Sequence, residues 1–458
     1  MAFPTTYASY LTALSTLFFG KEYNGAQKDK SDMKFINDFV LSNVDKKDYK
    51  HANHELLKRN YTTYIHTIPF MHCEFGKSGD IYTIIIDGLP LEGSFIAKGA
   101  GGFIFLGNDG FIYKFISSPF VSKVRNENGT VSDVSNPTPV NNVLKEIVIQ
   151  KLLSSVQYKN TKGDVVNVAP SVYNVMNCTN SIRFADGKVV IEPIKPNTWN
   201  CVIKMEKVAH SFQQMFYEQK KNLIPMLEDF LAIQDALAQN HIVFNHCDMK
   251  HDNVMYNDKK QMQWIDFGYA TMIVPLTFKE GKIVNVTLYS DACKMSREGN
   301  GTIHGYYQGK DILQLILTIY LMKYIHGSEI TMYDESSVSS KKFIYHILHT
   351  LGLLDVKDGN IIYSPILQDE VEAIQQKFRG KNPPDWIVAY NYNRRLRSKI
   401  PVYKINNQPM KNLFSQKNTV LHSNILKTRN VNRVQNTNNL HVNKTRKNYT
   451  RSTKSVGL

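Results

Sequence analysis

The sequence of 458 residues contains no long uninterrupted apolar run. The apolar stretch 11–19 near its start is broken by Thr12, Ser15 and Thr16, and no basic segment of the secretory type precedes it. A membrane-spanning helix needs roughly 20 consecutive apolar residues. We therefore expect no signal peptide, no membrane span and an intracellular protein. No internal repeat is visible either.

Cysteine is scarce, and the spacing of the cysteines suggests no pairs. The five cysteines are odd in number, scattered, and form no Cys-x-x-Cys pair. This pattern argues against a disulfide framework and against a structural zinc site, and it fits a reducing compartment. The five are Cys73, Cys178, Cys201, Cys247 and Cys293.

Acidic residues are absent from the last part of the chain, residues 391–458, which holds 15 Lys and Arg. Subtracting these 15 from the 55 basic residues of the chain leaves 40, equal to the 40 Asp and Glu. The body is therefore neutral, and the tail carries the excess charge. The tail has too little apolar surface to offset the entropy of ordering, so we expect disorder. It is either a solvated tail without a partner or an electrostatic attachment to nucleic acid or an acidic protein.

Strand signals dominate the first half of the chain, and helix signals dominate the second. The apolar fraction of 42% is ordinary for a globular protein. Hairpin turns are expected at Asn108-Asp109-Gly110 and at Asp186-Gly187, and residues 117–140 are expected to form a loop. Strands are expected at 81–86, 95–98, 103–106, 111–116 and 201–205, and helices at 143–153, 223–240 and 311–324. The pattern predicts an α+β fold.

Two polar motifs flank a short predicted hairpin. The first is His246-Cys247-Asp248-Met249-Lys250-His251-Asp252-Asn253, and the second is Asp266-Phe267-Gly268. Between them, 254–256 and 263–265 read as two apolar strands joined by a tight turn. The hairpin would bring two carboxylates, a lysine and an asparagine to one end. Phosphoryl transfer needs this set: a base, a cation at the moving phosphate, and oxygen ligands for magnesium.

These motifs carry a resemblance to the protein kinase superfamily. His246-x-Asp248-x-Lys250-x-x-Asn253 resembles the kinase catalytic loop, and Asp266-Phe267-Gly268 matches the metal-binding triplet. The spacing between the two aspartates is also similar to that of the family. The resemblance implies a divergent, eukaryotic-type serine/threonine protein kinase that uses ATP and Mg²⁺. The high content of Asn, Lys, Ile and Tyr is similar to that of kinases from large DNA viruses.

The resemblance also implies a domain organisation. It covers about residues 81–390 and implies a bilobal fold, with a strand-rich N-lobe carrying one main helix at 81–207 and a helical C-lobe at 208–390. Residues 1–80 would be an extension of unknown role, for which a helical segment packed on the core is the simplest expectation. Residues 391–458 are the basic tail.

At the nucleotide end, Gly99, Gly101 and Gly102 resemble the glycine-rich loop over the phosphates, although Ile104 stands where the family has its third glycine. A glycine-rich hairpin turn explains them equally well. By resemblance, Lys114 holds the α- and β-phosphates and Glu146 is its partner. The alternatives are a solvated strand-edge lysine and an exposed helical charge.

The adenine site and the remaining roles also follow from the resemblance. Met205 would be the gatekeeper, and Glu206 and Val208 would present backbone groups to adenine. His246 would be a structural residue braced against the backbone of the Asp-Phe-Gly segment, and Phe267 would pack between the lobes.

The reacting end would use four residues. Asp248 would orient the acceptor hydroxyl or act as its base, and Lys250 would neutralise charge on the γ-phosphoryl group. Asn253 and Asp266 would bind magnesium through oxygen atoms. Asp311 would brace the catalytic loop.

The acceptor is the least determined feature. Lys250, two places after the base, resembles serine/threonine kinases, so protein Ser/Thr hydroxyls are the expected acceptors. A small-molecule phosphotransferase and a non-catalytic, nucleic-acid-binding scaffold are the alternatives. Cys247 replaces an arginine that in many kinases binds a phosphorylated loop, and no Ala-Pro-Glu follows within 269–310. We therefore expect activity that does not depend on such phosphorylation.

Overall fold

The computed structural model describes most of the chain up to residue 289 and short segments beyond it. The described residues are 3–21, 30–45, 53–63, 65–78, 81–99, 102–125, 130–136, 138–219, 223–278, 281–289, 311–312, 314–316, 354–357 and 360–363. The predicted basic tail 391–458 and most of the predicted helix 311–324 lie outside them. The fold is mixed α+β and compatible with a kinase-like fold.

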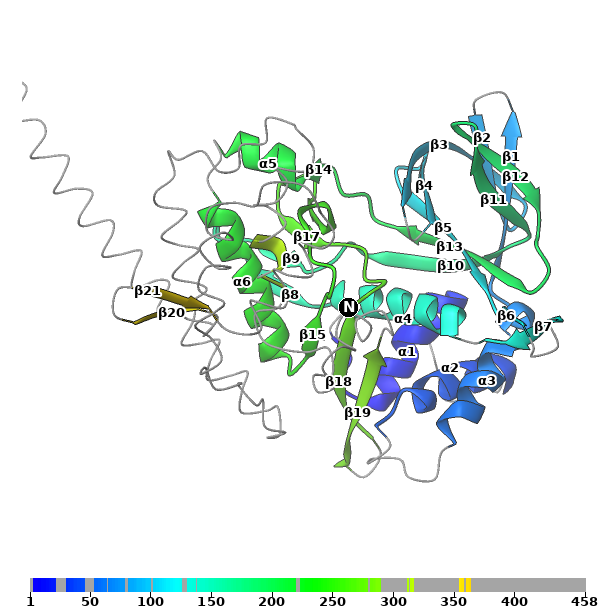
Figure 1. Ribbon diagram of the computed structural model, residues 1–458, viewed down its shortest axis with the longest axis horizontal. Helices are drawn as coiled ribbons and strands as arrows, with labels where there is room; N and C mark the ends of the chain where they lie inside the picture. The colour runs from blue at the N-terminus through cyan, green and yellow to red at the C-terminus, as the bar shows by residue number, and fades with distance from the viewer. Residues whose placement is uncertain are drawn as a thin grey trace, which may run out of the picture.

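A closed barrel of seven strands forms one side of the molecule (Figure 1). Adjacent strands run antiparallel, except that the first strand lies parallel to β10. Closure leaves the barrel without free sheet edges. In barrel order the strands are β1 (Met71–Ser78), β10 (Val172–Cys178), β13 (Thr198–Met205), β5 (Ile112–Pro119), β4 (Gly102–Gly107), β3 (Leu89–Gly99) and β2 (Ile81–Ile86).

The barrel begins at Met71, ten residues before the strands expected from the sequence. Strand β1 alternates in burial, with Cys73 and Phe75 buried and His72 and Glu74 exposed. Because polar residues alternate with the buried ones, the sequence of this strand is not apolar enough to have been recognised as a strand. Pairing with β2 and β10 completes the barrel.

Strand β13 separates two hydrophobic clusters. Its Val202 packs in the smaller cluster with Phe75, Phe105 and other barrel residues. Its neighbours Cys201 and Ile203 belong to the main core, because successive strand side chains point to opposite faces. The barrel wall is therefore continuous with the core beneath it.

Both predicted hairpin turns are confirmed. Asn108-Asp109-Gly110 joins β4 to β5, and Asp186-Gly187 joins β11 (Asn180–Ala185) to β12 (Lys188–Pro193). Asp186 and Gly187 both have positive φ, 50° and 74°, as a two-residue turn that matches strand twist requires.

The prediction of a loop over 117–140 is wrong. Strand β5 extends to Pro119, and a two-stranded ribbon of β6 (Val121–Arg125) and β7 (Val131–Ser135) follows. Helix α4 then begins at Thr138. The ribbon strands pair with each other and leave Val124, Val131 and Val134 exposed, so no buried face marked them in the sequence.

Within the described residues, three α-helices precede the barrel, in agreement with the helical segment expected in residues 1–80. They are α1 (Tyr7–Phe19), α2 (Lys30–Ser42) and α3 (His54–Thr63), followed by the short 3-10 helix η1 (Ile65–Thr67). Thr6 and Ser9 form a capping box at the start of α1, and Gly20 ends it at φ 64°. None of the helices that the structure describes is long and apolar enough to cross a membrane.

The remaining elements include those that carry the catalytic motifs. The helical ones are α4 (Thr138–Leu153), α5 (Phe212–Glu218), α6 (Ile224–Gln239) and the 3-10 helix η2 (His251–Asn253). The strands are β8 (Gln157–Lys159), β9 (Val165–Asn167), β14 (His210–Ser211), β15 (Val243–Asn245), β16 (Val254–Tyr256), β17 (Met262–Trp264), β18 (Thr271–Thr277), β19 (Ile283–Tyr289), β20 (Leu354–Lys357) and β21 (Asn360–Tyr363). Their small sheets are β14-β16-β17, β15-β18-β19, β8-β9 and β20-β21.

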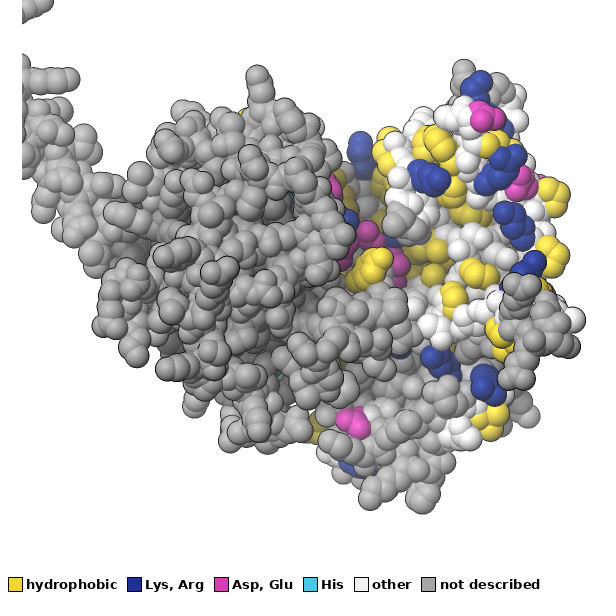
Figure 2. Space-filling model, viewed as in Figure 1, with side chains coloured by type: hydrophobic (Ala, Val, Ile, Leu, Met, Phe, Trp, Pro, Cys, Tyr) yellow, Lys and Arg dark blue, Asp and Glu magenta, His cyan; other side chains and the backbone are white. Residues whose placement is uncertain are grey.

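Charge is spread thinly over the visible barrel face. Lys and Arg side chains lie singly there, separated by apolar and uncharged groups (Figure 2). The described part of this face therefore offers no concentrated basic patch of the kind that binds nucleic acid.

Candidate active site

The predicted hairpin between the two motifs is confirmed, and it places them side by side. Strands β16 and β17 pair antiparallel, with Val254 opposite Trp264. At the motif end, the Ile265 amide donates to the Asn253 carbonyl at 3.0 Å. The residues preceding Asp266 and those following Asp248 are therefore in direct contact, as the chemistry of a shared site requires.

Lys114, Glu146 and Asp266 form a connected charge cluster, although they come from β5, α4 and the loop after β17. Lys114 Nζ lies 2.5 Å from Glu146 Oε1 and 3.6 Å from Asp266 Oδ1. The Lys114 and Glu146 side chains are only 11% and 9% exposed. These positions exclude the alternatives of a solvated strand-edge lysine and an exposed helical charge.

The electrostatics keep Lys114 charged. Burial alone would lower the pKa of Lys114, but the carboxylates of Glu146 and Asp266 outweigh burial and raise the pKa above its usual value. Asp266 is far more open, with its side chain 41% exposed. The cluster thus presents a fixed cation at its buried end and an accessible carboxylate at its open end.

Asp248 lies in a second group with Lys250 and Asn253. Lys250 Nζ is 3.1 Å from Asp248 Oδ2, and Asn253 Nδ2 donates to the Asp248 carbonyl at 2.8 Å. Burial would lower the pKa of Lys250, but the Asp248 carboxylate raises it on balance. The two lysines therefore remain cations at neutral pH.

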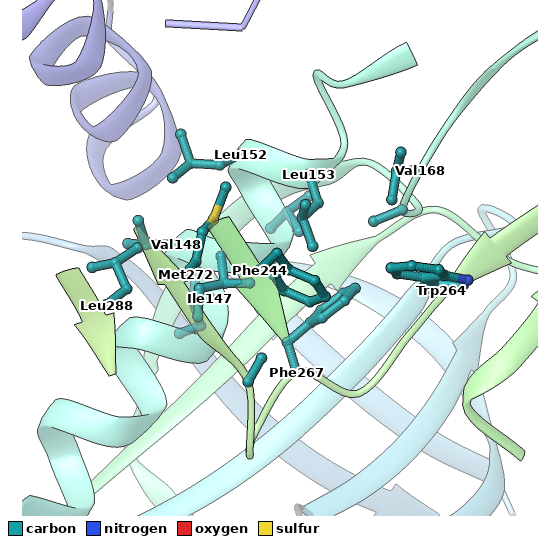
Figure 3. Close-up of a cluster of buried hydrophobic side chains, with 14 of the residues drawn as sticks. Ile147, Val148, Leu152, Leu153, Val168, Phe244, Trp264, Phe267, Met272 and Leu288 are labelled. Atoms are coloured by element: carbon teal, nitrogen blue, oxygen red, sulfur yellow. The ribbon is translucent and has the colours of Figure 1, made fainter. Parts of the chain in front are cut away.

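His246 and Phe267 connect the two motifs through a hydrogen bond and a ring contact. His246 Nε2 lies 2.8 Å from the Ile265 carbonyl, and because a carbonyl only accepts, Nε2 must carry the hydrogen. Phe267 is buried, with its ring 5.2 Å from that of His246 and 6.2 Å from that of Phe244. Figure 3 shows Phe267 beside Phe244 and close to Ile147 of α4. His246 thus contacts the backbone next to the Asp-Phe-Gly segment, as the resemblance implied, and Phe267 packs in the main core.

Two side chains from the helical residues 311–312 and 314–316 hold the catalytic loop. Asp311 is buried and accepts hydrogen bonds from the amides of His246 and Cys247, at 2.9 and 3.2 Å. Gln314 accepts from the Met249 amide at 3.1 Å and donates to the Cys247 carbonyl at 3.5 Å. The sequence motifs indicated Asp311 but gave no signal for Gln314.

Cys247 adopts an unusual backbone conformation between these contacts, with φ 63°, and Asp266 has the same φ. Left-handed non-glycine residues cost free energy and persist where surrounding contacts hold them. Cys247 is also disulfide-bonded, whereas Cys73, Cys178 and Cys201 are free and buried. The scattered cysteines did not predict this disulfide.

The glycine-rich segment is described at its two ends only, because Gly101 and Ala100 lie outside the described residues. Gly99 ends β3 and is exposed, and Gly102 opens β4. At Gly102, φ is 137° and an added Cβ would lie 2.0 Å from the Phe115 carbonyl oxygen. Close approach to β5 therefore explains this glycine without a nucleotide.

The predicted adenine segment follows β13 directly. Met205 is buried at the end of the strand, and residues 206–209 belong to no helix or strand and are partly exposed. The Glu206 amide donates to the Ser171 carbonyl at 2.9 Å, and the Glu206 carboxylate accepts from the Ser171 amide at 3.0 Å. At Glu206 a base could therefore be bound through the carbonyl only, with Val208 as the next position for backbone contacts.

The donor set fits magnesium held jointly with phosphates. Within the described ranges, no three His, Cys, Asp or Glu side chains gather as a complete metal cage. Magnesium does not need one, since it binds through one or two carboxylates together with substrate phosphates. The Asn253 amide nitrogen is engaged by Asp248, which directs its oxygen elsewhere, and the Asp266 carboxylate is accessible. These two residues could hold the ion.

A comparison with protein families gives a match over the candidate site. Residues 178–276 match the family described as Choline/ethanolamine kinase. This region is therefore similar to a protein-kinase-like domain. The kinase match spans the predicted adenine segment and both catalytic motifs, and it begins after Lys114 and Glu146. No curated protein matches the chain.

The kinase match supports phosphotransfer from ATP and shifts the expected acceptor. The matched family is named for small amino alcohols, whereas the expectation from Lys250 was a protein serine or threonine. The match supports neither a protein serine or threonine acceptor nor the resemblance to viral kinases.

Proposed function

We propose that this protein transfers the γ-phosphoryl group of ATP to a hydroxyl group of a small molecule, within a bilobal kinase-like fold. The observation that carries phosphotransfer is the cluster in which Lys114 contacts both Glu146 and Asp266. The match of residues 178–276 to Choline/ethanolamine kinase supports the acceptor class.

Each group has a role that follows from its surroundings. Lys114, fixed by Glu146, would bind the phosphates that precede the transferred group. Asp248 would orient the acceptor hydroxyl and receive its proton as the acceptor oxygen bonds to phosphorus and ADP leaves. Lys250 would compensate the charge on the transferred group. Asn253 and Asp266 would hold Mg²⁺, which when bound adds positive charge against the phosphate oxygens.

A protein Ser/Thr acceptor is the second candidate. It is favoured by the contact of 3.1 Å between Lys250 Nζ and Asp248 Oδ2, because the resemblance associates a lysine at this position with serine/threonine kinases. Attachment of the basic tail 391–458 to nucleic acid or an acidic protein remains a separate proposal. Removal of residues 391–458 should lower retention of the protein on heparin and leave phosphoryl transfer intact.

The test is acceptor choice with labelled ATP. The purified protein is incubated with choline, ethanolamine and other small amino alcohols in one arm, and with a generic basic protein in the other. Label in the amino alcohols supports the leading proposal, and label only in phosphoserine or phosphothreonine supports the second. Bound ATP without transfer to any acceptor would support a non-catalytic scaffold.

A variant pair ties the transfer to the site. Asp266→Ala should abolish transfer without unfolding the protein, because this carboxylate is accessible and would serve a metal ion. Asp258→Ala is the control, since this carboxylate lies exposed in the turn at the other end of the same hairpin. Near-normal transfer by Asp266→Ala would contradict the proposed role.

A further inference from the structure

The chain that follows Asp266-Phe267-Gly268 forms a hairpin next to the catalytic loop. Strand β18 begins three residues after Gly268 and pairs with β15, with Asn245 opposite Thr271. Strand β15 ends at Asn245, directly before His246. Strand β19 then pairs with the other side of β18 along its whole length. A displacement of this hairpin would therefore move the chain on either side of the site: β15, which precedes His246, and the residues that follow Gly268.

The outer edge of β19 is bound by residues from near the start of the chain. Val44 and Val286 form an antiparallel bridge. Beside it, the Asp45 amide donates to the Asn285 carbonyl at 2.9 Å, and the Thr287 amide donates to the Asn43 carbonyl at 2.7 Å. The segment after α2 therefore extends the small sheet by one short strand-like contact.

The far end of β18 is bound by the residues before α1. Thr6 forms a parallel bridge with Thr277, and the Thr277 amide donates to the Thr5 carbonyl at 3.0 Å. The Tyr7 ring lies with its centroid 4.2 Å from that of Phe278. Two separate parts of the N-terminal segment thus hold the two strands of one hairpin.

The contact is also hydrophobic. Tyr10 and Leu14 of α1 and Phe39 of α2 are fully buried in the same cluster as Val274 and Val286 of the hairpin. Figure 1 shows α1 beside β18 and β19, beneath α4. Helix α4 belongs to the same cluster through Val148 and Leu152, among others.

The N-terminal segment is linked to α4 by a side-chain hydrogen bond as well. The Tyr61 hydroxyl of α3 donates to Asn141 Oδ1 in the first turns of α4. Both partners are buried, with Tyr61 at 0% and Asn141 at 2% exposure. Because α4 carries Glu146, the N-terminal helices touch both the element that orients Lys114 and the strands that follow Asp266.

We propose that residues 3–21 and 30–45 are a built-in positioning element for phosphotransfer, which holds β18 and β19 in place and thereby fixes the two catalytic motifs relative to each other. This inference rests on the proposed function. In kinases the same task can be performed by a phosphate on the loop bound by an arginine. Here Cys247 stands in place of that arginine and cannot bind a phosphate through a charged guanidinium group. Backbone hydrogen bonds from the N-terminal segment hold the strands instead.

Proline substitutions test this because they remove single backbone donors. Asp45→Pro deletes the amide that binds the Asn285 carbonyl, and Thr287→Pro deletes the amide that binds the Asn43 carbonyl. Asp45 lies in the short segment that β19 binds and Thr287 lies in β19 itself, so each change removes one bond between the two. Asp45→Ala and Thr287→Ala keep the donors and control for the loss of each side chain.

The proline variants should lower kcat by about tenfold to a hundredfold and change KM for ATP less, because under the proposed function Lys114 and the adenine segment belong to β5 and the end of β13 in the barrel. Amide hydrogen exchange in β18, β19 and residues 245–248 should accelerate, and that in the barrel should not. The alanine variants should resemble the parent protein. A merely structural role would instead lower the folded fraction and leave kcat per folded molecule unchanged.

Two outcomes would overturn the inference. One is normal kcat in a proline variant whose β18 and β19 exchange rapidly. The other is loss of kcat only in proportion to unfolding. If the parent protein transfers phosphate to no acceptor, the proposed function fails by itself, and the exchange measurement still decides whether residues 3–21 and 30–45 hold the hairpin.

Discussion

Lys114 Nζ lies 2.5 Å from Glu146 Oε1, and this contact joins the barrel to helix α4. Buried ion pairs add little stability compared with apolar residues of similar volume, yet loss of one partner is costly because the other charge stays buried. The pair is therefore better explained by its role in the site than by its contribution to folding.

Lys114→Met should destabilise the fold by about 3–5 kcal/mol, because the Glu146 carboxylate would remain buried without its cation. The double variant Lys114→Met/Glu146→Leu should recover much of this loss, and neither variant should transfer phosphate. Urea unfolding and turnover of labelled ATP measure the two effects. A single variant as stable as the parent would show that the pair is not desolvated in solution.

Gln314 supplies the next prediction, because it bonds to both neighbours of Asp248. Its Oε1 accepts from the Met249 amide and its Nε2 donates to the Cys247 carbonyl. Gln314→Leu removes the two bonds on either side of Asp248, one of them to Cys247, which has positive φ, so the Asp248 carboxylate should lose its fixed position. We expect kcat to fall by about tenfold to a hundredfold with little change in KM for ATP.

Asn160 is a matched control for Gln314. It is buried, and its side-chain oxygen accepts from the amides of Lys162 and Asp164. Asp164 in turn accepts from Gln261, near the turn of the β16–β17 hairpin, away from the motifs. Asn160→Ala should lower stability without a change in kcat. Equal losses of kcat in both variants would assign Gln314 a general structural role.

Gly102 and Gly187 form a pair of glycine tests. Gly102→Ala would place a Cβ 2.0 Å from the Phe115 carbonyl oxygen, so β4 or β5 must shift, and KM for ATP should rise together with a fall in the melting temperature. Gly187 has a positive φ of 74° but nothing within 4 Å of an added Cβ. Gly187→Ala should therefore cost only about 1 kcal/mol of backbone strain, with unchanged KM. Thermal melts and ATP kinetics compare them.

The features that sequence analysis predicted correctly are local in the chain. The turn at Asn108-Asp109-Gly110 and the β16–β17 hairpin each depend on a few consecutive residues with a specific backbone preference. Lys114 and Glu146 were paired through the resemblance, and no spacing rule alone would have paired residues on a strand and a helix 32 positions apart.

The features that it missed are long-range. Closure of the barrel depends on the parallel pairing of Cys73 with Cys178, and nothing near either residue indicates the other. The contact of Asp45 with Asn285 joins two backbone groups, and that of Gln314 with Met249 joins a side chain to a backbone amide. Neither bond depends on the side chain of Asn285 or Met249. The β6–β7 ribbon was missed because its valines are exposed, so its pattern lacks a buried face.

Asp229 supplies a prediction on pH. This carboxyl lies in α6, and its Oδ1 accepts from the Thr161 amide at 2.7 Å. Burial raises the pKa of Asp229, and the hydrogen bonds from Thr161 offset this only in part. A raised pKa means that the folded state binds the proton more tightly than the unfolded state, so ionisation of Asp229 costs stability at neutral pH.

Asp229→Asn keeps the acceptor oxygen and removes the charge, so the variant should be more stable than the parent at neutral pH. The gain should shrink as pH falls through the pKa of Asp229, because the parent carboxyl is then neutral as well. Asp164→Asn should behave oppositely. Hydrogen bonds from Gln261 and Asn160 lower the pKa of Asp164, so its loss should reduce stability at neutral pH and matter little in acid. Urea midpoints across the acidic range measure both differences, and a gain for Asp229→Asn that does not change with pH would show that burial of the charge is not its cause.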